Sequence, residues 1–316
     1  MSLSILSRSQ PATLVIGSDG FIGGALMQRL RSAGKGVLGS TRRPESVDES
    51  HLYLDLSEDV TGWTSPCPVD VAVFCAGVAK IELCRRDPVK TARINVENTF
   101  YLMRRLVEKG VFVIYLSTNQ VFDGSQPYQR TEDPPSPGTE YGRQKAEVER
   151  RIRELGDAAA IVRLTKVLGP GSPPFSEWVD ALQRERVIHP FSDMRMAPIP
   201  LSCAVSVIHL VGERRIPGIL HVSGAYDISY AEAACRGAKL LGVDSRYVEP
   251  VLASGWGWDP SLLPLHTTLN GDRLKSVLGM EPPDVWGTIE RIFLKPQLLC
   301  EDERRWSHAS EGSRSL

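Results

Sequence analysis

The chain has 316 residues, 42% of them hydrophobic and 24% charged, an ordinary composition for a folded globular protein with a sizeable core. A formal net charge of −1, and no apolar run near the ~20 residues that span a bilayer, exclude nucleic acid and membranes from the expected partners. The six cysteines are scattered without a C-x-x-C pair, which argues against metal sites and disulfides and favours a reducing cytoplasm.

The first half of the chain alternates short β-branched runs with amphipathic stretches, a pattern typical of a parallel sheet covered by helices. Its most apolar runs are typical of strands buried on both faces. Strands are predicted over 13–16, 36–39, 71–75, 111–116, 159–164 and 218–222, and helices over 21–32, 88–109 and 138–155. The expected fold class is α/β, a Rossmann-like doubly wound parallel sheet with a smaller C-terminal substrate-binding region.

A glycine-rich turn follows the first expected strand. Gly17, Gly20 and Gly23 occur three residues apart in G-S-D-G-F-I-G (17–23), directly where a helix is expected to begin. Such a turn brings backbone N–H groups and the positive end of a helix dipole to a pyrophosphate. A purely structural turn is the alternative. The predicted dinucleotide contacts are Gly17, Ser18, Asp19, Gly20, Phe21 and Ile22.

The choice of nucleotide in this arrangement depends on residues at the end of the second strand. There the sequence reads S-T-R-R (40–43), with no carboxylate to accept a hydrogen bond from a ribose 2′-hydroxyl. Arginine has a fixed charge and a planar donor fork that suit phosphate. Thr41, Arg42 and Arg43 therefore predict NADP(H) rather than NAD(H), unless both arginines are only solvated loop charges.

Two segments carry candidate catalytic groups. Tyr141 and Lys145 are four residues apart, on one face of the helix expected there. A tyrosine titrates near ~10, and an adjacent ammonium lowers that pKa toward the range useful for proton transfer. Thr118, in S-T-N-Q-V-F-D-G (117–124), lies at the carboxyl end of a buried strand, where α/β sheets bind ligands. Its hydroxyl can orient a carbonyl or, alternatively, only terminate the strand.

These motifs, together with R-L-T-K-V-L-G (163–169), resemble the extended short-chain dehydrogenase/reductase superfamily, and within it the dTDP-4-dehydrorhamnose reductase, or sugar-nucleotide-binding, family. The similarity covers about residues 13–295. It implies that Tyr141 donates a proton to the reduced carbonyl oxygen, that Lys145 binds the nicotinamide ribose, and that Thr118 orients the carbonyl. It also implies cofactor contacts by Asp55, Leu56, Cys75, Ala76, Gly77 and Asn95.

The chain departs from this family where Asn119 and Gln120 replace the acid and tyrosine that usually follow the threonine. Amides cannot act as general acid or base, which disfavours dehydration, whereas carbonyl reduction needs only Tyr141 and the cofactor. Asn119 and Gln120 are expected to touch the substrate. Lys166 and Arg195 are candidates for its diphosphate, with solvated surface charges as the alternative.

The expected protein is an NADPH-dependent reductase of a keto group on a nucleotide-activated sugar, with a homodimer left open. Its predicted regions are an N-terminal extension (1–12), an NADP-binding Rossmann domain (13–169), a mainly substrate-binding region (170–296) and a flexible tail (297–316). A strand near 218–224 is expected to return to the main sheet. The alternatives are a nucleotide-sugar epimerase and a non-catalytic dinucleotide-binding subunit resembling the methionine adenosyltransferase β subunit.

Overall fold

The computed structural model describes residues 12–256 and 263–294. The predicted tail and all of the predicted N-terminal extension except Ala12 lie outside the described residues. The chain divides into two compact units. The first comprises the described residues up to Val121 together with Pro137–Arg163 and Val205–Leu220, and the second comprises Phe122–Ser136, Leu164–Ala204 and the described residues from His221.

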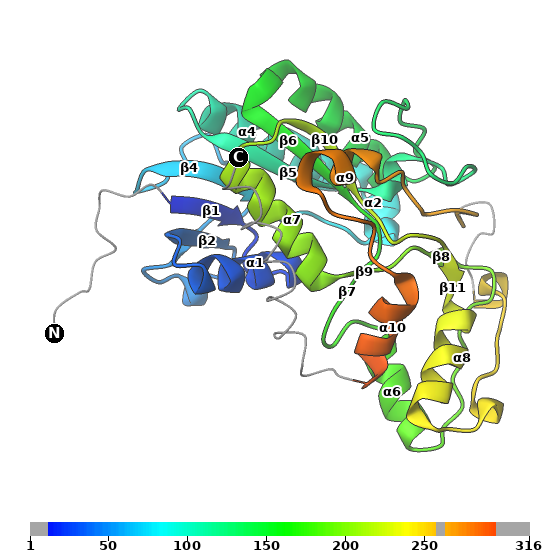
Figure 1. The fold of residues 1–316 in the computed structure, drawn as a ribbon. Coiled ribbons are helices and arrows are strands. Elements are labelled where there is room, and N and C mark those ends of the chain that lie inside the picture. Colours follow the sequence, from blue (N-terminus) through cyan, green and yellow to red (C-terminus); the bar gives the residue numbers. More distant parts are fainter. Residues whose placement is uncertain (1–11, 257–262, 295–316) are drawn as a thin grey trace, which may run out of the picture. The chain divides into compact units, whose positions relative to one another are not determined.

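A seven-stranded sheet forms the centre of the first unit, in the order β10-β6-β5-β4-β1-β2-β3 (Figure 1). β1 pairs in parallel with both β2 and β4, so that Leu14 lies opposite Leu38 on one side and Ala72 on the other. The strand order reverses beside β1, which confirms the predicted doubly wound, Rossmann-like α/β fold. The strands are β1 (Ala12–Ile16), β2 (Val37–Thr41), β3 (His51–Tyr53), β4 (Val69–Phe74), β5 (Phe112–Thr118), β6 (Ala159–Leu164) and β10 (Gly218–Val222).

Helices cover both faces of this sheet. On one face, Leu102 and Val148 from the helices are buried against Phe74 and Val113 of the strands. On the other face, the helix that carries Gly212 comes so close that a Cβ there would lie 3.2 Å from the Val71 side chain. The helices of this unit are α1 (Phe21–Ser32), α2 (Ile81–Arg86), α3 (Pro88–Ala92), α4 (Thr99–Val107), α5 (Glu140–Ile152) and most of α7 (Leu201–Arg214).

The single helix expected over 88–109 is three successive pieces. A π-helical turn, Arg93–Asn98, separates α3 from α4. Such turns are frequent at functional sites, and this one contains Asn95, one of the predicted cofactor contacts. The extent of α1 was predicted correctly, whereas α2, α7 and β3 were not predicted.

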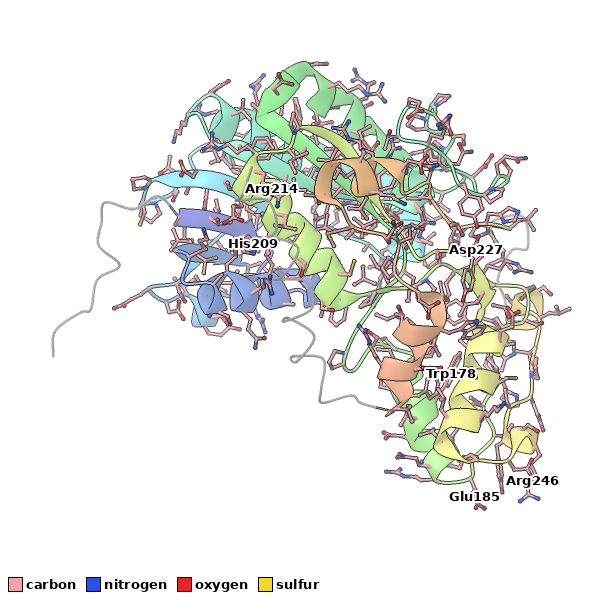
Figure 2. All side chains as sticks on the ribbon, viewed as in Figure 1. Trp178, Glu185, His209, Arg214, Asp227 and Arg246 are labelled. Carbon is pink, nitrogen blue, oxygen red and sulfur yellow. The ribbon has the colours of Figure 1, made fainter. Side chains whose placement is uncertain are left out.

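The second unit has its own core. The helices α6 (Phe175–Gln183), α8 (Tyr230–Leu241) and α10 (Val285–Leu294) pack around Phe175. The ring centroid of Phe175 lies 5.9 Å from that of Tyr230 and 5.2 Å from that of Trp178, which is labelled in Figure 2. The remaining elements are α9 (Asp272–Leu278), the antiparallel pair β8 (Arg195–Met196) and β11 (Ile228–Ser229), and the parallel pair β7 (Val167–Leu168) and β9 (Ile199–Pro200). Among the described residues, no helix has both the length and the hydrophobicity needed to cross a membrane.

Candidate functional site

The glycine turn joins β1 to α1 and requires glycine at two of its positions. Gly17 has a φ of +88°, and a Cβ there would lie 2.7 Å from the backbone nitrogen of Ala76. A Cβ at Gly23 would collide with the carbonyl oxygen of Gly17. Gly20 is the N-cap of α1 and offers no side chain to the first helical turn. The N–H groups of that turn can therefore bind an anionic ligand.

A cavity of about 330 Å³ opens beside this turn, at the carboxyl ends of β1, β2 and β4. Many of the predicted cofactor contacts meet there. The predicted residues that line it are Gly17, Asp19, Gly20, Arg42, Asp55, Leu56, Cys75, Ala76 and Gly77. The lining residues that were not predicted are Ile16, Ser40, Leu54, Ser57, Val78 and Ile94, all of them close in sequence to predicted ones.

The other predicted residues of the turn do not line this cavity. Ser18 is buried, and its hydroxyl donates to the carbonyl oxygen of Ser40 at 2.9 Å, which ties the turn to β2. Phe21 is 45% exposed, and Ile22 is half-buried on α1. Contacts of these residues with a phosphate group would therefore come from their backbone N–H groups.

A carboxylate lies at the end of β2, contrary to the sequence-based expectation. β2 extends to Thr41, whose hydroxyl donates to Asp19 Oδ2 at 2.6 Å. The Nη2 of Arg43 lies 3.2 Å from the same oxygen. The acid comes from the glycine turn and not from the strand itself, which is why the S-T-R-R sequence did not reveal it. Of the two arginines, Arg42 lines the cavity and Arg43 is paired with Asp19.

Thr118 is the last residue of β5 and is 8% exposed. Its Oγ1 accepts a hydrogen bond from the backbone N–H of Gln120 at 3.2 Å, within the turn Asn119–Val121. The helix α5 packs against this turn, since a Cβ at Gly142 would collide with the carbonyl oxygen of Gln120. The start of α5, with Tyr141 as its second residue, therefore lies directly beside the turn that follows Thr118.

Lys145 lies one helical turn after Tyr141 and is 8% exposed. Its Nζ donates to the carbonyl oxygen of Leu116 at 2.8 Å and lies 5.8 Å from the ring centroid of Tyr141. Burial lowers the pKa of Lys145 to about 8, against the opposing effect of the Glu149 carboxylate. Burial also raises the pKa of Tyr141 above its ordinary value. The expected lowering of the Tyr141 pKa is therefore not found in this structure, where burial has the largest effect on the phenol.

Asn95 acts on the cavity through its neighbour Val78. Its Oδ1 accepts from the Val78 N–H at 2.7 Å, and its Nδ2 donates to the Val78 carbonyl oxygen at 3.0 Å. Val78 lines the cavity, whereas Asn95 is 3% exposed and does not. The side chain of Asn95 therefore fixes the segment that follows β4.

The four predicted substrate contacts fall in both units. Asn119 and Gln120 are half-buried in the turn after β5, and Gln120 Oε1 accepts from the Thr139 hydroxyl at 3.4 Å. Lys166 is half-buried in the second unit, where burial lowers its pKa. Arg195 is exposed on β8. Substrate contacts by these four residues stay predictions.

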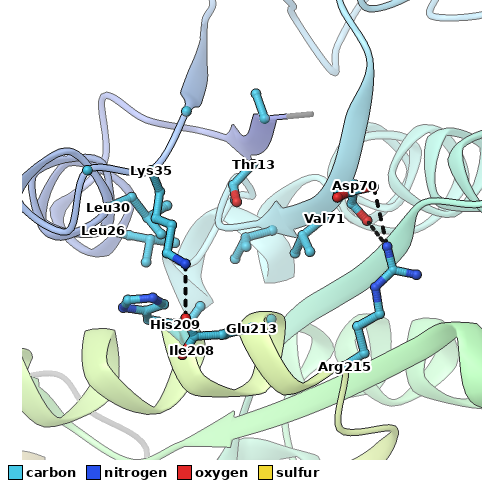
Figure 3. A pocket seen from close by; sticks show the side chains of 15 residues that line it. Thr13, Leu26, Leu30, Lys35, Asp70, Val71, Ile208, His209, Glu213 and Arg215 are labelled. Carbon is cyan, nitrogen blue, oxygen red and sulfur yellow. Dashed lines mark hydrogen bonds and ion pairs between the residues drawn. The ribbon is translucent and has the colours of Figure 1, made fainter. Parts of the chain in front are cut away.

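A second cavity, of about 420 Å³, lies in the first unit at the amino ends of β1 and β4 (Figure 3). Its lining includes Lys35, paired with Glu213 at 3.0 Å, and Arg215, paired with Asp70 at 3.4 Å. Because this cavity lies at the opposite ends of these strands and no predicted site residue lines it, the smaller cavity is the candidate functional site. In the described part of the chain, no cluster of three or more His, Cys, Asp or Glu residues could hold a metal ion.

The family model named RmlD substrate binding domain matches residues 12–295. The chain belongs to this family. The predicted resemblance to the dTDP-4-dehydrorhamnose reductases is thereby confirmed.

Curated relatives include both reductases and a protein named as a subunit. A probable low-salt glycan biosynthesis reductase, Agl14 of Haloferax volcanii, is 24% identical over 85% of this chain and 93% of its own length. The dTDP-4-dehydrorhamnose reductase of Streptomyces griseus is 26% identical over 88% and 91%. The methionine adenosyltransferase 2 subunit beta of Rattus norvegicus is 26% identical over 76% and 75%.

Solved structures share the fold at lower identity. The dTDP-4-dehydrorhamnose reductase of Bacillus anthracis, in complex with NADP, matches with a TM-score of 0.74 and 19% identity over 90% of this chain and 98% of that one. MoeE5, in complex with UDP-glucose and NAD, matches with a TM-score of 0.71 and 22% identity over 89% and 98%. These likenesses show a common fold.

Proposed function

We propose that the protein is an NADPH-dependent reductase of a keto group on a nucleotide-activated sugar. The observation that carries the proposal is the position of the Tyr141–Lys145 helix beside the turn after Thr118. Reductases in the same family, and structural neighbours complexed with NADP or NAD and with UDP-glucose, support the choice of reaction, cofactor and substrate class.

The residues around the smaller cavity fit a dinucleotide. Gly17 and Gly23 keep side chains away from the turn, and the first turn of α1 offers N–H groups to a diphosphate. Asp55 and Leu56 are assigned to the adenine, and Cys75, Ala76 and Gly77 to the strand-end wall of the site. Arg42 is the cation assigned to a 2′-phosphate, which is the basis for proposing NADP(H). A bound nicotinamide supplies the hydride.

The chain's own residues supply the proton and orient the substrate carbonyl. The Thr118 hydroxyl donates a hydrogen bond to the substrate carbonyl, and Tyr141 transfers its phenolic proton to the same oxygen as the carbon receives the hydride. The ketone thus becomes an alcohol. The raised pKa of Tyr141 keeps its phenol protonated before the transfer. The Lys145 ammonium stabilises the phenolate that is left behind.

Turnover of a keto-sugar nucleotide such as dTDP-4-dehydrorhamnose, followed by NADPH consumption and product analysis, tests the proposal. We expect Tyr141→Phe to lower kcat about 10²- to 10⁴-fold, the usual contribution of a general acid, with little change in NADPH affinity. Wild-type turnover in Tyr141→Phe would contradict the role of Tyr141. Dinucleotide binding without reduction of any nucleotide-activated keto sugar would contradict the reductase assignment.

A second candidate function follows from the relative named as a subunit. The rat methionine adenosyltransferase 2 subunit beta is 26% identical to this chain, a percentage like those of the two reductases, over a smaller share of the chain. This similarity favours a non-catalytic, dinucleotide-binding subunit as the alternative. Copurification with a larger enzyme whose kinetics change when this chain is added, together with failure to reduce keto sugars, would support it. The cytoplasmic location and the homodimer stay predictions.

A further inference from the structure

We propose that Asp19 is a specificity-determining residue that reduces the preference of the site for NADPH over NADH. The inference rests on the proposed function, because it assumes that the cavity beside the glycine turn holds the adenosine ribose. It gives a specific role to a residue that the sequence alone predicts only as a dinucleotide contact.

The first step is the position of the carboxylate. In doubly wound dinucleotide-binding folds, an acid at the end of the second strand accepts a hydrogen bond from the ribose 2′-hydroxyl. Here Asp19 reaches that place from the glycine turn, since the hydroxyl of Thr41, the last residue of β2, donates to its Oδ2 at 2.6 Å. Asp19 also lines the cavity. It can therefore do for NAD(H) what a strand-end acid does.

The second step is how the carboxylate is satisfied. The contacts from Thr41 Oγ1, Arg43 Nε and Arg43 Nη2 all end on Oδ2, at 2.6, 3.3 and 3.2 Å. None of these contacts uses Oδ1, which leaves it an acceptor for a ribose hydroxyl. The Asp19 side chain is 28% exposed, so a ligand can reach it.

The third step is the charge that a 2′-phosphate would meet. Arg42 lines the cavity, and no described carboxylate forms an ion pair with it, so it attracts the phosphate. Asp19 repels the phosphate and also holds Arg43 through the ion pair. The two effects oppose each other, whereas the two arginines in the sequence alone suggest only a preference for NADPH.

Isothermal titration calorimetry with NADPH and NADH tests the inference on wild type, Asp19→Asn and Arg42→Ala. Asp19→Asn keeps the shape of the side chain and an acceptor for Thr41, but removes the charge. We expect wild type to bind both cofactors with dissociation constants within about tenfold of each other, a difference of ~1.4 kcal/mol. Asp19→Asn should bind NADPH about tenfold more tightly and NADH no more tightly than wild type does. Arg42→Ala should weaken NADPH alone.

Glu45→Gln is the matched control. Glu45 is exposed two residues after Arg43, and its loss changes the net charge as Asp19→Asn does without altering the cavity wall. An equal gain in NADPH affinity in Glu45→Gln would overturn the inference, because the effect would then be one of overall charge. Thermal unfolding without ligand checks that each variant is folded, and Asp19→Ser provides a second neutral side chain if Asp19→Asn is not.

The outcomes separate this inference from the proposed function. If wild type binds neither dinucleotide, both fail. If wild type binds NADPH but Asp19→Asn changes the affinities for the two cofactors by the same factor, or weakens NADPH, only the role of Asp19 is overturned. The latter result would mean that Asp19 positions Arg43 for the phosphate.

Discussion

Asn95 and Gln144 join two helical segments of the first unit through a buried amide pair, in which Asn95 Nδ2 donates to Gln144 Oε1 at 2.8 Å. Gln144 Nε2 in turn donates to the hydroxyl of Thr91 at 3.0 Å. Asn95 also holds the backbone of Val78 in the cavity wall. The pair therefore connects the wall of the candidate site to α5, the helix that carries the predicted catalytic residues.

We expect Gln144→Leu to lower the free energy of unfolding by about 1–3 kcal/mol, because it leaves buried polar groups of Asn95 and Thr91 without that partner. Urea unfolding measures the loss. Gln28→Leu, at an exposed glutamine on α1, is the control and should change stability by less than about 0.5 kcal/mol. A double-mutant cycle with Asn95→Leu should give a coupling energy of about 0.5–3 kcal/mol, and strictly additive losses would contradict the connection.

Lys145 makes stability depend on pH in the alkaline range. Because burial lowers its pKa from 10.5 to about 8, the unfolded chain holds a proton between these values that the folded protein has released. The unfolding free energy contributed by this group therefore rises with pH, by at most about 1.4 kcal/mol per unit. We expect the unfolding free energy of wild type minus that of Lys145→Met to increase from pH 8 to 10.5, so that wild type gains stability relative to the variant. A difference that stays constant would mean that the Lys145 pKa is not lowered.

Glu149 and Arg163 form an ion pair in which both side chains are fully buried, with Arg163 Nη2 2.6 Å from Glu149 Oε2. Removing the Glu149 carboxylate takes this ion pair from a buried guanidinium, so Glu149→Gln should cost about 3–5 kcal/mol in urea unfolding. Glu147→Gln, which breaks half-exposed ion pairs on the same helix, should cost no more than about 1 kcal/mol. Equal losses in the two variants would show that the buried pair has no special importance.

Gly23 sets the distance between α1 and the glycine turn. Because a Cβ at this position collides with the Gly17 carbonyl oxygen, Gly23→Ala should lower stability by about 1–3 kcal/mol, measured by thermal unfolding. It should also weaken NADPH binding, measured by calorimetry, if the proposed cofactor site is correct. Gly62→Ala is the control, since a Cβ there would have no atom within 4 Å. Unchanged NADPH affinity in a destabilised Gly23→Ala protein would place the cofactor elsewhere.

The sequence was sufficient for the fold class and for several elements of the first half of the chain, whereas helices α6 to α10 were not predicted. Residues 21–32 follow a glycine turn and have helical spacing of apolar residues, and α1 has these bounds. α2 and β3, with six and three residues, are too short to show a period. The π-helical turn around Asn95 depends on hydrogen bonds to distant residues such as Val78 and Gln144, which spacing along the chain cannot reveal.

In the candidate site, too, local patterns could be predicted from the sequence, whereas contacts between distant residues could not. The glycine turn and the Tyr141–Lys145 spacing are local patterns and could be read directly. The place of Asp19 depends on a contact between residues 22 positions apart, and the pKa of Tyr141 depends on burial by the surrounding core. Both are properties of the assembled chain, and both change the chemistry expected from the motif.

The last segment of the first unit, Val205–Leu220, is synthesised after part of the second unit. Its edge strand β10 and most of α7 follow Leu164–Ala204, which belongs to the second unit. A nascent chain that ends at Arg163 therefore has as its edge β6, a strand that is buried along its whole length in the finished sheet and whose unpaired backbone groups can pair with other chains. During synthesis, the sheet of the first unit therefore cannot gain its last strand until a large part of the second unit has left the ribosome. Because the two units interleave along the chain, they are expected to complete their folding together.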